Sequence, residues 1–316
     1  MACVKPAGYF TDRLGSHRRL QSAATTVVND TGGFLMRRRV LAAALAMLGL
    51  FASAPLSAAA GDPAPLRMAV HPYASTLTLI NTFRPLQQYL AARLGRPVEF
   101  YTAASFDAFV DTLMSGGYDI AISPPHFAVM AMERNYAPLL HFRAGLEPVL
   151  AVPADSPARQ PGDFRGKRIA MADRTAFIRL VAVKWLADAG LQAGRDYQLV
   201  ERPSHGAAVG AVKAGEADAG LTTTTALKQL PAELQQQMRA VSTGLRFPHL
   251  FTMAHGRLGE PLIGQLRQAL LDFPATEEGK GFMERTAFGG YEPITEDKIR
   301  QMVPYVELYR RLESGR

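Results

Sequence analysis

The stretch of sequence that decides the fold is Phe164-Arg165-Gly166-Lys167-Arg168-Ile169-Ala170-Met171-Ala172-Asp173-Arg174-Thr175-Ala176-Phe177. Its pattern predicts a glycine-closed turn, a buried strand over 168–172, a short polar loop and a helix over 176–189 that stops at Gly190. A helix that starts at the carboxyl edge of a parallel sheet turns free backbone N–H groups toward that edge, where anions and other ligands bind. The stretch is therefore either part of a binding site or an ordinary strand, loop and helix without a ligand.

The loop after this strand supplies the first candidate site residues. We expect Thr175 to cap the helix, and its hydroxyl and the N–H groups of Ala176 and Phe177 to contact an anion. Simple capping is the alternative, and both roles can hold together. Asp173 would repel a dianion at this position, whereas the cation of Arg174 or of Arg179 could offset that repulsion.

The first 60 residues precede the fold. A basic start at 36–39, an apolar run over 40–50 and small residues over 52–60 predict a secretory signal peptide that is cleaved after Ala60. A membrane anchor is the alternative, but the apolar run is short for one. We expect Met36 to be the true start and residues 1–35 to be a non-native upstream leader; an internal export signal behind a disordered leader is the other possibility. The sequence thus predicts a periplasmic location.

Charge and cysteine content exclude several classes of function. The leader and signal peptide hold seven basic and two acidic residues, so the mature chain keeps 35 − 7 = 28 basic and 28 − 2 = 26 acidic residues. This near balance gives no support for nucleic-acid binding. The chain's one cysteine, Cys3, lies in the leader, which excludes disulfides and thiolate chemistry from the mature protein.

The order of the predicted elements indicates an α/β fold. Strands over 66–70, 98–101 and 118–123 alternate with helices, and a second block repeats this order with strands over 168–172, 197–200 and 217–221. Helices are predicted over 176–189, 206–214 and 226–238 in the second block, and over 261–271, 277–286 and 295–312 in the tail. We expect mostly parallel sheets with helices on their faces.

No pattern in the sequence argues for an enzyme. The histidines of the mature chain show no HExxH or other metal-ligand spacing, and no nucleophile elbow, phosphate-binding loop or dinucleotide fingerprint is present. No carboxylate pair stands out for acid–base chemistry. We therefore predict no catalytic residues, no metal and no cofactor.

Six stretches in a characteristic order carry a resemblance to a known family. They are 85–90 before Leu94-Gly95, 117–121, 164–170, 194–197, 204–209 and 215–220. Together they resemble the periplasmic phosphate/phosphite/phosphonate-binding proteins of ABC transporters, which are type-II periplasmic binding proteins. The resemblance implies two α/β lobes around a ligand cleft, with residues 61–150 and 248–316 in lobe one and 151–247 in lobe two. It also implies crossovers near 148–153 and 241–251, and C-terminal helices that pack on lobe one.

The chain departs from this family at the loop that should hold the ligand. Relatives carry a Ser-Thr-Ser-Gly-like run where this chain has Asp173-Arg174-Thr175-Ala176, which leaves one hydroxyl. The Ser204-His205 pair is kept. The resemblance therefore implies a phosphonate-, phosphite- or phosphate-like ligand, and the departure leaves a carboxylate or a sulfonate as alternatives.

Other candidate ligand-binding residues follow predicted strands. Each has a plain structural alternative, such as rim packing for the tyrosine, a helix cap for the histidines or an ordinary strand end for the threonine. These candidates are Tyr73, Ser75, Thr76, Ser123, His126, Ser204, His205 and Thr222. The threonine run from Thr222 to Thr225 could line the cleft with hydroxyls.

The sequence thus predicts an exported solute-binding protein, monomeric, that captures a small anion by lobe closure and delivers it to the membrane permease of an ABC transporter. Two alternatives remain open. One is a periplasmic sensor that signals to a membrane kinase, which neighbouring kinase genes rather than permease genes would indicate. The other is a hydrolase built on the same scaffold, which a turnover assay would reveal.

Overall fold

The computed structural model describes residues 64–314. The leader, the start at Met36, the signal peptide with its cleavage after Ala60, and Cys3 lie outside the described residues. Residues 61–316 form one compact unit. Among the helices of residues 64–314, none combines the length and the apolar character that a membrane crossing requires.

The first sheet has six strands within the described residues, in the order β11-β4-β10-β3-β1-β2. Its strands are β1 (Leu66–Val70), β2 (Val98–Tyr101), β3 (Ile120–Ser123), β4 (Tyr136–Phe142), β10 (Phe251–His255) and β11 (Tyr291–Pro293). Strands β2, β1 and β3 pair in parallel, whereas β10 runs antiparallel between β3 and β4, and β11 pairs antiparallel with β4. The antiparallel pairs arise because β10 brings the chain back from the second sheet into the middle of the first.

The second sheet has five strands in the same part of the chain, in the order β7-β6-β8-β5-β9. Its strands are β5 (Pro148–Pro153), β6 (Arg168–Met171), β7 (Gln198–Glu201), β8 (Ala219–Thr223) and β9 (Met238–Ser242). Strands β7, β6 and β8 are parallel, and β5 is antiparallel to both β8 and β9. Because β5 pairs along its whole length in this sheet, we propose that the lobes divide at the two links 143–147 and 243–250.

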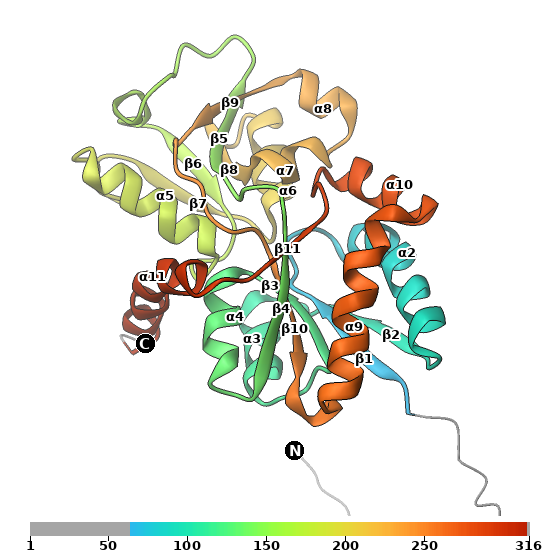
Figure 1. Ribbon diagram of the computed structural model, residues 1–316. Coiled ribbons are helices and arrows are strands. Elements are labelled where there is room, and N and C mark those ends of the chain that lie inside the picture. Colours follow the sequence, from blue (N-terminus) through green and yellow to red (C-terminus); the bar gives the residue numbers. More distant parts are fainter. Residues whose placement is uncertain (1–63, 315–316) are drawn as a thin grey trace, which may run out of the picture. The chain divides into compact units, whose positions relative to one another are not determined.

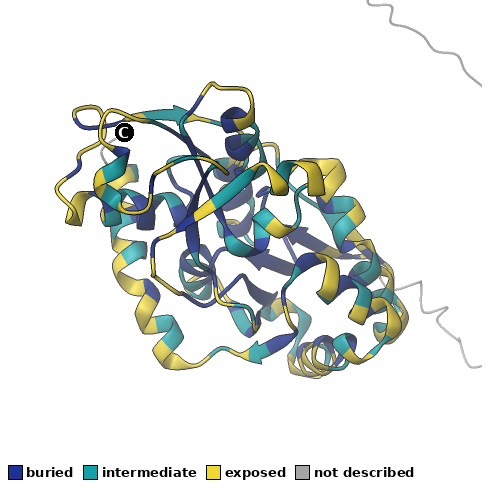
Figure 2. Cartoon of the chain, turned by 90° about the horizontal axis from the view of Figure 1, so that it is seen from above, coloured by how far each residue is buried: buried dark blue, intermediate teal, exposed yellow. Residues whose placement is uncertain are grey.

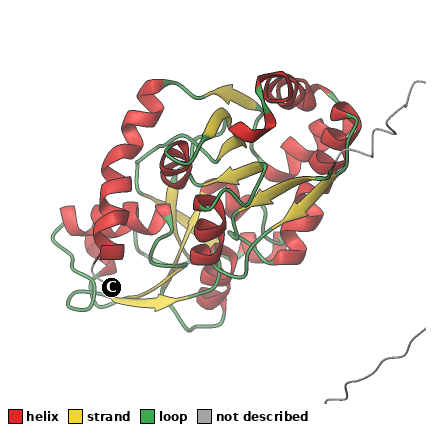
Figure 3. Ribbon diagram, turned by 90° about the horizontal axis from the view of Figure 1, so that it is seen from below, coloured by secondary structure: helices red, strands yellow, loops and turns green. Residues whose placement is uncertain are grey.

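Helices cover both faces of each sheet (Figures 1 and 3). The helices are α2 (Thr76–Leu94), α3 (Phe106–Met114), α4 (Pro125–Met132), α5 (Phe177–Asp188), α6 (His205–Lys213), α7 (Thr224–Lys228), α8 (Ala232–Gln236), α9 (Glu260–Asp272), α10 (Glu277–Thr286) and α11 (Glu296–Ser314). Three short 3₁₀ turns are η1 (Pro161–Phe164), η2 (Gly256–Leu258) and η3 (Phe273–Ala275).

Alternation along the strands divides the core of the first lobe into two layers. In β1, Met68 and Val70 pack with α2, α9 and α10, whereas Ala69 between them packs with α3 and α4. Successive side chains of a strand point to opposite faces, so a small alanine on one face lets those helices approach closely. Figure 2 shows the result: the central strands are buried, and outer helices such as α2 and α9 keep an exposed face.

The core of the second lobe is also divided into two layers by its sheet, and one helix, α6, lies especially close to that sheet. Ile169 and Met171 pack with α5, whereas Ala170 packs with α6. Gly220 of β8 lies against the backbone of α6, and a Cβ built there would come within 2.5 Å of the carbonyl oxygen of Ala208. The contact therefore requires glycine at this strand position.

One predicted helix is wrong. The sequence pattern predicts a helix over 226–238, but the chain forms the two short helices α7 and α8 and then enters β9 at Met238. Pro231 is the N-cap of α8. Because proline disfavours helical conformation in the residue before it and cannot continue a helix from that residue, the segment is divided there.

The last helix, α11, contacts both lobes. Met302 belongs to the core of the second lobe, whereas Tyr309 packs in the layer formed by α3 and α4. An ion pair joins Arg310 to Glu133 just after α4, and another joins Arg174 of the second lobe to Glu313. The predicted C-terminal helices α9 and α10 pack on the first lobe, and α11 spans the two lobes.

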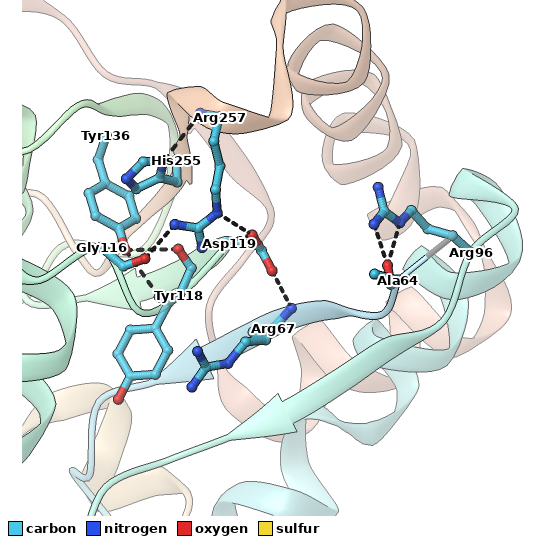
Figure 4. A network of polar contacts seen from close by, with 9 residues as sticks. All are labelled: Ala64, Arg67, Arg96, Gly116, Tyr118, Asp119, Tyr136, His255 and Arg257. Carbon is cyan, nitrogen blue, oxygen red and sulfur yellow. Dashed lines mark hydrogen bonds and ion pairs between the residues drawn. The ribbon is translucent and has the colours of Figure 1, made fainter. Parts of the chain in front are cut away.

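The carboxylate of Asp119 cross-links several segments at the edge of the first sheet where β1 and β3 begin. This edge is opposite to the one at which the site described below lies. Asp119 accepts hydrogen bonds from the backbone N–H of Arg67 at 2.8 Å and from Nε of Arg257 at 2.8 Å (Figure 4). The Tyr136 hydroxyl donates to the carbonyl of Tyr118 at 2.8 Å in the same network. These bonds tie β1, β3, β4 and the segment after β10 together.

Candidate ligand-binding site

A small cavity lies where the carboxyl ends of strands from both sheets meet. Its volume is about 40 Å³, room for a few water molecules. The residues that line it come from the end of β1, the starts of α3, α4, α5 and α6, the β8–α7 junction and the links between the lobes. They are His71, Tyr73, Phe106, Pro124, Leu146, Phe177, Ile178, His205, Thr223, Thr225, Ala226, Gln229, His249, Leu250 and Phe288.

Hydrogen bonds close the two lobes over this cavity. The Tyr73 hydroxyl donates to Oε1 of Gln229 at 3.2 Å, and the carbonyl of Tyr73 accepts from the N–H of His205 at 3.3 Å. Gln229 also donates through Nε2 to the carbonyl of Thr286 at 2.9 Å. The Gln229 side chain therefore bridges from the second lobe to two segments of the first.

No formally charged side chain lines the cavity. The wall contains no Asp, Glu, Lys or Arg among the residues that the structure describes. The predicted cation Arg174 donates instead to Glu313 at 2.9 Å. Arg179 is likewise engaged, with the carbonyl of Ala172 and the carboxylate of Glu201. Binding of an anion in this cavity would therefore require neutral donors or side chains that gain a proton.

Two buried imidazoles face the cavity without hydrogen-bond partners. His71 is 4% exposed and His205 is 6% exposed, and in both rings Nδ1 is buried and makes no hydrogen bond within residues 64–314. Phe106 lies against both rings, with centroids 5.7 Å from His71 and 6.3 Å from His205. Burial lowers the pKa of His205 to about 4. The pKa of His71 is lowered well below 6.5, mainly by burial and to a smaller extent by the neighbouring His205. Both rings are neutral at pH 7 when no ligand is bound.

A hydrogen-bond chain ends at Thr223. The N–H of Leu250 donates to Nδ1 of His249 at 2.9 Å, so the proton of this neutral ring must sit on Nε2. Nε2 then donates to Oγ1 of Thr225 at 2.9 Å, and a further hydrogen bond of 3.0 Å joins the hydroxyls of Thr225 and Thr223. Oγ1 of Thr223 also accepts from the N–H of Ala226 at 3.0 Å. The Thr223 hydroxyl is thus held by two partners at the wall of the cavity.

Burial fixes the protonation state on which this chain depends. The pKa of His249 is lowered to about 3 by desolvation and, to a smaller extent, by His141. The ring therefore stays neutral across the physiological range, and the direction of its bond to Thr225 does not change with pH there.

The start of α5 offers two further donors. Phe177 and Ile178 line the cavity, and their N–H groups are the first two of the helix. Neither N–H makes a hydrogen bond with another described residue. The N-cap residue, Ala176, has no side chain that could cap them. The helix start therefore presents free N–H groups, and the positive end of its dipole, to the cavity.

Comparison with known proteins identifies the family. The family model described as "ABC transporter, phosphonate, periplasmic substrate-binding protein" matches residues 68–299, well over half of the chain. This chain belongs to that phosphonate-binding family.

Solved structures confirm the predicted two-lobed α/β fold. PhnD1 of Prochlorococcus marinus, solved in complex with methylphosphonate, superposes with a TM-score of 0.69 at 15% identity over 79% of this chain and 98% of that one. The binding protein of a Pseudomonas aeruginosa phosphonate transporter gives a TM-score of 0.70 at 15% identity over 80% and 89%. The alkanesulfonate-binding protein of Xanthomonas axonopodis pv. citri, bound to MOPS, gives a TM-score of 0.55 at 20% identity over 80% and 94%. At these identities the likeness concerns the fold alone.

In this member of the phosphonate-binding family, the structure brings three of the predicted site residues to the cavity. Tyr73, Phe177 and His205 line it. The two residues of the pair Ser204-His205 have different roles. Ser204 accepts from the N–H of Ala207 and caps α6, so His205 is the first residue of that helix and lies beside the cavity.

The residues of the 173–176 loop have other roles than the predicted ones. Thr175 is fully buried, and both its N–H and its hydroxyl donate to the carboxylate of Asp173. Its hydroxyl therefore does not cap α5, and Ala176 is the N-cap. Asp173 thus takes up both donors of Thr175, including the hydroxyl that the sequence pattern assigns to an anion. Arg174 is held by Glu313, as described above.

Five more predicted residues lie outside the cavity wall. Ser75 caps α2 by accepting from the N–H of Thr78, and both Ser75 and Thr76 are exposed. Ser123 is buried and donates to the carbonyl of Pro124 at 3.3 Å. His126 and Thr222 are fully buried behind the wall.

His126 serves as a contact between the lobes. Its Nε2 donates to the carbonyl of Thr175 at 3.1 Å, and its ring stacks on Phe127 with centroids 3.9 Å apart. Burial lowers its pKa to about 3, so the ring is neutral. It holds the 173–176 loop against α4 and makes no contact with the cavity.

Sequence reasoning missed three polar residues of the wall, which are His71, Gln229 and His249. Of the threonine run 222–225, Thr223 and Thr225 line the wall, whereas Thr222 does not. His71 directly follows β1, a position that could have pointed to the site. The alternation of side chains in β8 could have separated Thr223 from Thr222, which points to the other face. Nothing local distinguishes His249, because its role depends on a partner 24 residues earlier in the chain.

Proposed function

We propose that the mature chain is an exported binding protein that captures a small oxyanion of the phosphonate type in this cavity and delivers it to the membrane permease of an ABC transporter. The observation that carries the proposal is that donors of the second lobe converge on one cavity that first-lobe residues such as His71 and Tyr73 enclose. The N–H groups of Phe177 and Ile178 and the hydroxyl of Thr223 would bind the anion's oxygens. Closure of the lobes would bury the ligand and signal its presence to the permease.

The cavity wall also limits the class of ligand. Carboxylate side chains are absent from the wall as the structure describes it, so an ammonium group on the ligand would be buried without a counter-charge. Apolar side chains, among them Leu146, Leu250 and Phe288, would surround the substituent instead. The small volume favours a ligand of few heavy atoms. Phosphite and methylphosphonate fit this description, and aminoalkylphosphonates do not.

A sulfonate is the second candidate. The absence of fixed cations from the described wall favours an anion of charge −1, and a sulfonate carries one charge at every physiological pH. The structural likeness extends to proteins whose ligands are sulfonates. Methanesulfonate therefore belongs in the ligand panel as a direct competitor of methylphosphonate.

We further propose export to the periplasm by the signal peptide ending near Ala60, a monomeric protein, and binding without turnover. The family is one of substrate-binding components of transporters. No group of three or more His, Cys, Asp or Glu side chains within residues 64–314 is placed to hold a metal ion. We therefore expect neither a metal nor a cofactor to take part in binding.

Isothermal calorimetry on the mature chain, residues 61–316, tests the proposal. The panel is phosphite, methylphosphonate, 2-aminoethylphosphonate, phosphate, methanesulfonate and acetate, at a fixed pH of 6.5. We expect phosphite or methylphosphonate to bind most tightly and 2-aminoethylphosphonate to bind at least tenfold more weakly. Preference for the amine-bearing ligand, or no binding by any anion, would overturn the proposal. Phosphorus NMR of the same samples over a day would reveal any turnover.

A further inference from the structure

The cavity combines a wall without fixed charge with two neutral imidazoles that have no partners. An anion transferred from water into such a space loses its hydration, and helix N–H groups carry only a partial positive charge. In other anion-binding sites, the positive charge that balances the anion comes from arginine or lysine. Here those cations are engaged outside the cavity, so the balancing charge must come from another source.

His71 and His205 are placed to supply it. His71 follows β1 in the first lobe and His205 opens α6 in the second, so closure brings one imidazole from each side to the same cavity. The N–H of His205 bonds to the carbonyl of Tyr73, two residues after His71, which fixes the backbones of the two segments to each other. The buried Nδ1 atoms lack partners, although an unsatisfied buried polar atom is costly.

The groups that face these rings are neutral. Around His71 they are the aromatic rings of Tyr73, Phe106 and Phe109 and, from α6, α4 and the link before β10, the imidazoles of His205, His126 and His249. Burial is the cause of the lowered pKa of His205. In α3, Asp107 follows Phe106, but the charges that act on it are those of Asp173 and Arg174. Carboxylates therefore do not hold a proton on either ring when no ligand is bound.

We propose that the site takes up a proton together with its anion, and that the paired imidazoles of His71 and His205 hold this proton against the ligand. The proposal rests on the proposed function, because it requires an anionic ligand in this cavity. The proton comes from solvent and adds to a ring nitrogen, and the resulting N–H donates to an oxygen of the ligand. A ligand of charge −1 and one proton leave the occupied cavity neutral.

The direction of the pH effect follows from linkage. In the absence of ligand, burial holds both imidazoles neutral, with the pKa of His205 near 4. An adjacent anion favours the charged imidazolium and raises that pKa in the complex. Between the two pKa values, affinity rises by up to about tenfold for each unit that the pH falls, because one proton binds with each ligand. Below the lower value and above the higher one, affinity becomes independent of pH.

Calorimetry with methanesulfonate and methylphosphonate tests this inference. Methanesulfonate has no titration of its own between pH 5 and pH 8.5, so any proton bound with it goes to the protein. The binding enthalpy is measured at pH 6.5 in buffers of different ionisation enthalpy, and the slope gives the number of protons taken up. We expect about one proton for each anion bound, and an affinity that falls as the pH is raised.

The outcomes separate this inference from the proposed function. Binding of either anion without proton uptake, and with constant affinity from pH 5 to pH 8.5, would overturn the inference and leave the function standing. Failure of every anion to bind at any pH would overturn the function itself. With methylphosphonate, the ³¹P shift reports whether the bound ligand is protonated, and imidazole ¹⁵N shifts report whether the histidines are. Protonation of the ligand alone would contradict the role of the histidines.

Variants locate the proton. His71→Asn and His205→Asn each replace one imidazole with an amide that cannot take up a proton. We expect at least one of the two variants to lose half or more of the proton uptake. The control is His255→Asn, because His255 lies at the amino edge of the first sheet and accepts from the N–H of Arg257. Unchanged proton uptake in both cavity variants would contradict the assignment. If a variant does not fold, the ¹⁵N spectra of the unmodified protein still decide the matter.

Discussion

Oγ1 of Thr225 lies 2.9 Å from Nε2 of His249, and this contact joins α7 of the second lobe to the link that leads back into the first. The bond has a fixed direction because His249 accepts at its other ring nitrogen from the N–H of Leu250. Thr225 also shares a hydrogen bond of 3.0 Å with the hydroxyl of Thr223, which lines the cavity. A residue in a link between the lobes is thus connected through Thr225 to a group in the site.

Thr223→Val should weaken binding of methylphosphonate by about 1–2 kcal/mol, because it removes a neutral donor to the anion. Thr222→Val is the matched control, since Thr222 is the neighbouring residue of the same strand and its buried hydroxyl makes no hydrogen bond in the described structure. Calorimetry on both variants checks this. Equal losses of affinity in the two variants would exclude a direct role for Thr223.

Thr225→Val should lower the free energy of unfolding by about 1–3 kcal/mol, because Nε2 of His249 is then buried without an acceptor. It should also weaken binding, since the Thr223 hydroxyl loses one of the two partners that hold it. Thr225→Ser keeps the hydroxyl, so this variant should retain most of the stability and most of the affinity of the unmodified protein. Urea denaturation and calorimetry measure the two quantities. A valine variant as stable as the unmodified protein would show that the chain is not formed in solution.

Gly220→Ala should destabilise the second lobe by about 1–3 kcal/mol, because the added Cβ meets the backbone of α6. Gly210→Ala, in α6, is the control: a Cβ there meets nothing within 4 Å, and alanine should stabilise the helix by about 0.5–1 kcal/mol. Thermal unfolding of both variants checks the opposite signs. Destabilisation by both substitutions would contradict the packing of α6 on β8.

Acid should unfold the protein through its buried histidines. His126 and His249 have a pKa of about 3 when folded and about 6.5 when unfolded, so below pH 6.5 the unfolded state binds protons that the folded state excludes. Their contribution to stability is complete above pH 6.5 and is lost as the pH falls toward 3, by up to about 1.4 kcal/mol per pH unit for each ring.

Urea denaturation between pH 4.5 and pH 7.5 measures this loss. Saturating methylphosphonate should reduce the pH dependence in that range, because the proton bound with the ligand is retained by the folded state. A free energy of unfolding that stays constant from pH 7 to pH 5 would contradict the burial of these rings.

Local patterns predicted much of the fold. The strand expected over 168–172 is observed as Arg168–Met171, and the helix expected over 277–286 is observed with those bounds. Hydrophobic periodicity and glycine stops are local signals, and they suffice for such elements. The division of the predicted helix over 226–238 depends on Pro231, a local signal that the sequence interpretation passed over.

The site was less accessible to sequence reasoning. Phe177 and His205 could be expected at the cavity because each begins a helix after a strand. The role of Thr175 could not, because whether its hydroxyl faces a ligand or Asp173 depends on loop geometry. The pairing of His249 with Thr225 requires the chain to cross between the lobes, and single-sequence patterns do not contain that contact.

The position of the phosphorus atom in a crystal structure with methylphosphonate tests the central claim most directly. The account predicts that this atom lies between the lobes, with phosphonate oxygens at hydrogen-bond distance from the N–H groups of Phe177 and Ile178 and from the hydroxyl of Thr223. A phosphonate bound instead between α5 and α11, in the groove lined by Leu180, Val183, Tyr305 and Leu308, or on an outer face of either lobe, would contradict it.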